Sequence, residues 1–220
     1  MFKAAYGSLW DYELVETEDF DEAWAAFTSR FQAVNVTMPF KAQAAEKADI
    51  RSEEVELAGT ANILVKTENG IKAYNTDFLA VKAILERILS ESDPSANPSV
   101  TVVGFGGAGR AAAAAAKACV RDVRVLHHDD IVDGVESDIV IYTLPKAVPG
   151  TERIKAKVIV EANYRDPSFS TEALRLSGTE YVPGTQWLEL QAEFGFPLMT
   201  GMDIPKKFHN LQCESPKGDR

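Results

Sequence analysis

The stretch VTVVGFGGAGRAA, residues 100–112, constrains the fold more than any other part of the chain. Its valine-rich start predicts a buried strand over Val100–Val103, and its alanine-rich end predicts a helix over Ala111–Cys119. The turn between them holds four glycines: Gly104, Gly106, Gly107 and Gly109. Without a Cβ, such residues let backbone N–H groups approach a phosphate, and the helix that follows offers its positive N-terminus. The order strand, glycine turn, helix favours a dinucleotide-binding unit, and a turn without a ligand is the alternative.

An acidic residue beyond the glycines bears on the choice of cofactor. In dinucleotide-binding units an acid about 20 positions further on accepts a hydrogen bond from the ribose 2′-hydroxyl. Asp129 follows the expected strand Val123–Leu126 at that spacing, and LHHDD, residues 126–130, offers no arginine for a 2′-phosphate. The spacing therefore favours NAD over NADP. Two alternatives would remove this preference for NAD: Asp129 could belong to a solvated turn, or Arg110 could bind the 2′-phosphate.

The rest of the chain predicts an α/β protein with a linker in the middle. Residues 90–99, SESDPSANPS, hold two prolines and no apolar run, which is typical of a linker. Before it we expect helices and strands in mixed order: helices at Phe2–Leu9, Asp19–Phe31, Ala42–Ala48 and Asp77–Leu89, and strands at Tyr12–Glu16, Ala33–Met38, Thr60–Lys66 and Ile71–Tyr74. After it we expect a parallel sheet: strands at Val100–Val103, Val123–Leu126, Asp138–Thr143 and Val158–Glu161, then a helix near Leu188–Phe194. The interval from Asp129 to Asp138 is too short for a full crossover helix, so this unit should be trimmed.

Composition and charge exclude several classes of protein. Hydrophobic residues make up 45% of the chain and charged residues 25%, the usual balance of a globular protein. A net charge of -10 makes nucleic acid or an anionic membrane a poor partner. Two cysteines and three histidines have no metal-binding spacing, so no metal is expected. The acidic N-terminal stretch does not resemble a signal peptide, and the cytoplasm is the default location.

The heptapeptide NVTMPFK, residues 35–41, marks a second candidate site. Its polar and apolar residues alternate up to a proline, as in a strand that ends there. Ligands of α/β proteins bind at the carboxyl ends of strands, so Lys41 is a candidate functional residue. For the heptapeptide alone, a surface lysine after a turn is the simpler explanation.

Six motifs in collinear order resemble those of the shikimate dehydrogenase (shikimate/quinate 5-dehydrogenase) family. They extend from the N-terminal region to Gly201, and their shared order is far more specific than any one of them. The matching segments are NVTMPFK, GTANIL, YNTDF, GFGGAGRA, EANYRDP and WLELQAEFGFPLMTG. They are similar, in that order, to the family's NVT-x-P-x-K, G-A-x-N-T, NTD, GAGGA-x-R-A, D-x-x-Y-x-P and ML-x-x-Q-A…WTG.

The resemblance implies an enzyme with two α/β domains. Residues 1–90 would form the substrate-binding domain, with a C-terminal helix over 186–220 packing back on it, and residues 91–185 a Rossmann-type NAD(P)-binding domain. The family reduces 3-dehydroshikimate to shikimate with NADPH, in aromatic amino-acid biosynthesis. The family's first strand and the serine pair that grips the substrate carboxylate have no counterpart here, so we expect the N-terminal strand to be missing.

Residue by residue, the resemblance assigns roles to the matching positions. Lys41 matches the catalytic lysine and Asp77 its paired aspartate. Hydride transfer to a ketone builds charge on the carbonyl oxygen, so a proton donor must stand beside it, and a structural ion pair is the alternative. Substrate binding is implied for Thr37, Asn62, Tyr164 and Gln191. Cofactor binding is implied for the loop, with Asp129 added from its spacing: Gly104, Gly106, Gly107, Ala108, Gly109 and Arg110.

Two departures from the family pattern keep other functions open. His127-His128-Asp129 replaces the NADP-type Asn-Arg-Thr, and the loop TLPKAV, residues 143–148, replaces a segment that usually ends in Gly-Met. An NAD-dependent quinate/shikimate dehydrogenase is therefore one alternative. A non-catalytic binding protein of the same fold is another. We also expect a tendency to form homodimers, because loss of the first strand would expose a sheet edge.

Overall fold

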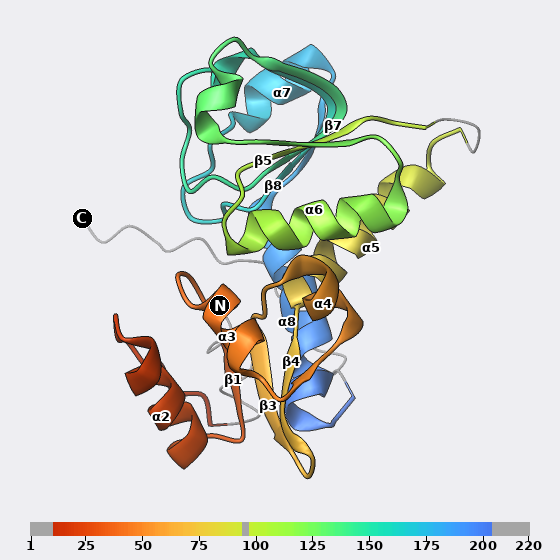
Figure 1. Cartoon of the computed structure of the whole chain (residues 1–220). Helices are drawn as coiled ribbons and strands as arrows, with labels where there is room; N and C mark the ends of the chain where they lie inside the picture. The colour runs from red at the N-terminus through yellow and green to blue at the C-terminus, as the bar shows by residue number, and fades with distance from the viewer. Residues whose placement is uncertain (1–10, 94–96, 204–220) are drawn as a thin grey trace.

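The computed structural model describes residues 11–93 and 97–203. Two β-sheets lie at opposite ends of the molecule, with long helices packed where they meet, and the last of these helices runs down beside the lower sheet (Figure 1). These helices are α5 (Thr76–Ser90), α6 (Gly107–Cys119) and α8 (Gly184–Thr200). The predicted α/β class is confirmed, and the space between the two sheets is the natural place to look for a site.

The five-stranded sheet is wholly parallel, with the strand order β6-β5-β7-β8-β9. Its strands are β5 (Val100–Val103), β6 (Val123–Leu126), β7 (Val135–Tyr142), β8 (Ile154–Glu161) and β9 (Glu180–Val182). Because β6 and β7 lie on opposite sides of β5, the order of the strands in the sheet reverses at β5. Ligands of such sheets bind at the carboxyl ends of the strands at this point. Between β6 and β7 stands only a short 3-10 helix, η1 (His128–Ile131), so this unit is trimmed as predicted.

The four-stranded sheet is mixed, with the order β1-β3-β4-β2. Its strands are β1 (Ala33–Asn35), β2 (Ile50–Arg51), β3 (Ile63–Thr67) and β4 (Gly70–Tyr74), and its helices are α2 (Phe20–Arg30), α3 (Lys41–Lys47) and α4 (Glu53–Ala58). Apolar side chains from these elements form its core, among them Phe27, Ala44, Val55 and Leu64. Among the described residues, β1 is an edge strand.

Polar side chains cap the first turns of α2 and α5. Asp19 caps α2 by accepting hydrogen bonds from the backbone N–H groups of Asp21 and Glu22. Asn75 caps α5 in the same way, with its Oδ1 accepting from Phe78 N–H at 3.0 Å. Such caps satisfy the N–H groups that a helix leaves without partners, so they fix the residue at which each helix begins.

Two strands expected in the first half of the chain differ from the prediction. Residues 12–16 form no strand, because no neighbouring strand of the described chain pairs with them. The strand β1 ends at Asn35 instead of Met38. Beyond it Thr37 and Phe40 close a turn, in which Phe40 N–H donates to the Thr37 carbonyl at 3.0 Å.

The helices also differ at their ends. The helix α6 begins at Gly107 and not at Ala111, so part of the glycine turn is itself helical. The helix α8 ends at Thr200, where Gly201 adopts a φ of +69° and stops it, so the expected helix over 186–220 is too long. The expected helix at residues 2–9 and the segment 204–220 lie outside the described residues. Six short elements were not predicted: β2, α4, η1, η2 (Thr151–Arg153), α7 (Thr171–Ser177) and β9.

Candidate active site between the two sheets

Lys41 and Asp77 form an ion pair at the centre of the candidate site. Lys41 is the first residue of α3, and Asp77 lies in the first turn of α5. Lys41 Nζ stands 2.6 Å from Asp77 Oδ2, with side chains that are 15% and 3% exposed. The backbone of Lys41 is also fixed, since its carbonyl accepts from Ala61 N–H at 2.8 Å. The structure thus brings together two residues that lie 36 positions apart in the sequence.

Two amide side chains extend this pair. Asn62 Nδ2 lies 3.1 Å from Asp77 Oδ2 and 3.3 Å from Gln191 Oε1. The other end of the same amide, Oδ1, accepts from Thr76 N–H at 2.8 Å. Asn62 is therefore held by the start of α5 and reaches α8 through Gln191. Four of the predicted site residues share one hydrogen-bonded network: Lys41, Asn62, Asp77 and Gln191.

Three residues that sequence reasoning did not single out support this network. Thr76 also donates its hydroxyl to Asn62 Oδ1 at 3.2 Å. Asn75 is fully buried and donates from Nδ2 to the Thr60 carbonyl at 2.7 Å. An asparagine two residues before an acid, at the start of an apolar periodic run, is a helix N-cap signal that could have identified Asn75.

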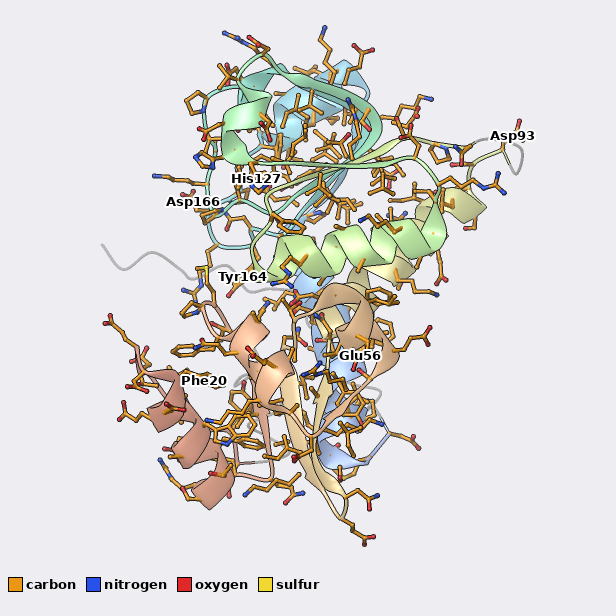
Figure 2. All side chains as sticks on the ribbon, viewed as in Figure 1. Phe20, Glu56, Asp93, His127, Tyr164 and Asp166 are labelled. Carbon is orange, nitrogen blue, oxygen red and sulfur yellow. The ribbon has the colours of Figure 1, made fainter. Side chains whose placement is uncertain are left out.

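Thr37 and Tyr164 lie apart from the network. Thr37 is exposed, and its hydroxyl donates to the neighbouring Met38 carbonyl at 3.2 Å. Tyr164 is 41% exposed, with the Arg165 guanidinium 5.6 Å from its ring centre. Figure 2 shows Tyr164 on the part of the upper sheet that faces the lower one. Their predicted contact with substrate stays a prediction.

A buried carboxylate fixes the segment that carries Tyr164. Glu161, at the end of β8, is fully buried and accepts from Ser168 N–H and from the Tyr181 hydroxyl, each at 2.6 Å. Burial, together with the hydrogen bond to Glu161, raises the pKa of Tyr181 well above its usual range. The tyrosine therefore stays protonated and keeps donating to Glu161. The segment 162–168 is held at its start by β8 and at its end by the hydrogen bond from Ser168 N–H to Glu161.

The glycine turn has the features that a dinucleotide phosphate requires. Gly104 adopts a φ of +98°, which favours glycine. A Cβ on Gly109 would lie 2.2 Å from the Gly104 carbonyl oxygen, so only glycine lets the helix approach the strand this closely. A Cβ on Gly106 would meet nothing within 4 Å. No side chain caps α6, which leaves its first backbone N–H groups without a side-chain acceptor and available to a phosphate.

Asp129 lies where the sequence predicted it, just beyond β6. It belongs to η1, its side chain is 85% exposed, and its Oδ1 stands 3.2 Å from His128 Nε2. The carboxylate of the neighbouring Asp130 already has a partner within the chain, because it accepts a hydrogen bond from His127 N–H at 2.7 Å. Of the two acids, Asp129 is therefore the one with a carboxylate available to a ligand at the end of β6.

Several known proteins similar to this chain are described as shikimate dehydrogenases. A shikimate dehydrogenase (NADP(+)) from Anaeromyxobacter sp. (strain K) is 27% identical over 241 residues, covering 94% of this chain and 85% of that protein. The structure of shikimate dehydrogenase 1 from Peptoclostridium difficile matches with a TM-score of 0.75 and 17% identity, over 97% of this chain and 92% of that one. The chain is related to the shikimate dehydrogenases. No protein-family model matches it.

A third similar protein adds a structure with ligands. The shikimate 5-dehydrogenase of Thermus thermophilus, solved in complex with NADP(H) and shikimate, matches with a TM-score of 0.69 and 22% identity. The match covers 94% of this chain and 90% of that one. At this identity it supports the shared fold. In the described part of the chain, no helix is long and apolar enough to cross a bilayer.

Two arginines, Arg110 and Arg124, lie near the glycine turn in the sequence. Arg124, in β6, donates to the Thr101 hydroxyl and the Glu136 carbonyl. Arg110 projects toward α4, where its Nη2 would lie 2.6 Å from a Cβ on Gly59. Neither guanidinium is directed at Asp129.

Proposed function

We propose that this protein is an NAD(P)-dependent oxidoreductase of a CH–OH group, which reduces 3-dehydroshikimate to shikimate in aromatic amino-acid biosynthesis. The observation that carries the proposal is the Lys41–Asp77 pair, 2.6 Å apart and nearly buried beside a glycine turn fit for a dinucleotide. The relatives that match over most of their length support it through their shared name. Shikimate-dependent reduction of NAD or NADP, followed by cofactor absorbance, tests it directly.

In this proposal the side chains of the network divide the work. The bound cofactor supplies the hydride. Lys41 gives its proton to the oxygen that gains charge as the ketone is reduced, and Asp77 holds the ammonium group in place. Asn62 and Gln191 offer amide groups to the hydroxyls of the substrate. Thr37 and Tyr164 would line the substrate from the two sides.

The chain would be divided by role at its linker. We propose that residues 1–90 bind the substrate together with α8, which packs against α5 and contacts β1 and β3. Residues 91–185 would bind the cofactor through the glycine turn, residues 104–110. Since α8 brings Gln191 to Asn62, the end of the chain completes the site that its first half begins.

We predict that the purified protein binds NAD(H) at least as tightly as NADP(H). The exposed carboxylate of Asp129 would repel a 2′-phosphate, and Arg124 and Arg110 are both directed elsewhere. Fluorescence titration with both reduced cofactors measures the preference. Asp129→Asn should tighten NADPH binding, whereas Asp133→Asn, an exposed acid nearby, should not. A clear NADPH preference that Asp129→Asn leaves unchanged would contradict this prediction.

Two alternatives make different predictions for the same assay. An NAD-dependent quinate/shikimate dehydrogenase would oxidise quinate as well as shikimate, and the replaced Asn-Arg-Thr segment favours it. A non-catalytic binding protein would turn over neither compound, yet would still bind cofactor. The retained Lys41–Asp77 pair favours an enzyme, since a binding protein has no need of a proton donor at this position.

We predict that the protein forms homodimers at micromolar concentration. In the described residues β1 has one free edge, and a cavity of about 560 Å³ opens beside it. Three exposed large side chains lie around that cavity: Leu14, Val15 and Met38. Free edges next to apolar surface favour pairing with another chain. Size-exclusion chromatography with light scattering should give a mass that rises with concentration, and a constant monomer mass would rule the dimer out.

A further inference from the structure

Glycine is required at position 107 for a reason different from that at the neighbouring positions of the turn. Its φ is not positive, so its backbone conformation does not require glycine. It is also the first residue of α6, a position where alanine is accepted. A Cβ placed there would lie 2.8 Å from Lys41 Cδ, 3.2 Å from its Cβ and 3.4 Å from its Cγ. The space beside Gly107 is therefore filled by the aliphatic part of the Lys41 side chain.

That side chain has little freedom to move away. Its ammonium group is held at 2.6 Å by the buried Asp77 carboxylate, and its Cβ is fixed by the first turn of α3. The turn has little freedom either, because the Thr60 hydroxyl donates to the Gly107 carbonyl at 3.3 Å. A methyl group on Gly107 must therefore displace the lysine from Asp77 or push α6 away from Thr60.

We infer that Gly107 is a positioning residue for Lys41: the bare backbone of the glycine turn forms the wall against which the lysine side chain lies. The same turn would then serve two purposes, since its free N–H groups face the cofactor and this glycine sets the direction of the ammonium group. The catalytic meaning of the inference rests on the proposed function. The contact itself is a feature of the cofactor-free protein and can be tested without activity.

A double-mutant cycle in thermal stability tests the contact. Gly107→Ala should lower Tm by roughly 2–4 °C or more in the otherwise unchanged protein. In a Lys41→Ala background the Cδ and Cγ atoms are gone, so most of that loss should disappear. Equal losses in both backgrounds would overturn the inference, because the methyl group would then clash with something other than the lysine.

The reactivity of the Lys41 amine tests the positioning. Amine acylation of the cofactor-free protein, followed by peptide mass spectrometry, should modify Lys41 several-fold faster in Gly107→Ala than in the unchanged protein. Gly106→Ala is the matched control, because its Cβ enters open space and should leave that labelling rate as it was. Unchanged labelling in Gly107→Ala would overturn the inference even if the protein proves to be an active dehydrogenase. Faster labelling would uphold the inference even if no activity is found.

Discussion

Lys41→Ala is expected to lower kcat by roughly 10²–10⁴-fold while KM for shikimate changes only a few-fold, because general acid catalysis contributes a factor of that size. Steady-state kinetics in the direction of shikimate oxidation measures both constants. Lys47→Ala is the control, since Lys47 lies on the same helix but pairs with Asp21 at the surface, 2.7 Å away. A normal kcat with a raised KM would mean that Lys41 only binds substrate.

Trp187→Ala should cost about 3–5 kcal/mol of the free energy of unfolding, the range for removing a large core side chain. Trp187 is 1% exposed and packs in the cluster that joins α5, α6 and α8 to the parallel sheet. Urea denaturation followed by circular dichroism measures the loss. Since Gln191 lies one helical turn further along α8, the variant should also bind substrate less tightly than the unchanged protein.

Trp187→Phe is the matched control for that experiment. Within the described residues the buried Trp187 Nε1 has no hydrogen-bond partner, so its removal forfeits no hydrogen bond. Phenylalanine still fills most of the volume, and the loss should be less than half of that for alanine. A loss below about 1 kcal/mol for Trp187→Ala would contradict this prediction. It would mean that the neighbouring side chains move into the cavity left by the tryptophan.

Some elements could be predicted from sequence because one interaction dominates them. The strands Val100–Val103 and Val123–Leu126 have the expected bounds, since buried parallel strands are short, continuous apolar runs. The strands β2 and β9 have two and three residues, too few for any periodicity to register. Residues 12–16 hold strand-forming residues such as Tyr12 and Val15. A strand exists only where a neighbouring strand pairs with it, and the local sequence does not reveal that neighbour.

The candidate site was predictable as a set of residues but not as a geometry. Motif order identified Lys41, Asn62, Asp77 and Gln191, and the structure brings all four together. The contact between Gly107 and Lys41 could not be foreseen, because a glycine motif does not reveal which neighbour occupies the space of each absent Cβ. The glycines also made the start of α6 hard to predict, because glycine has a low intrinsic helix propensity.

The packing of α5 bears on how far the chain can be taken apart. Its first turn carries Asp77, and its buried face shares one hydrophobic cluster with α6, α8 and strands of the parallel sheet. A cut at the linker after Ser90 would leave that face bare on one fragment and the complementary face bare on the other. The two pieces should therefore fail to fold separately, yet re-form the site when mixed. In the proposed function the linker separates a substrate-binding part from a cofactor-binding part, while one hydrophobic core includes residues from both sides of it.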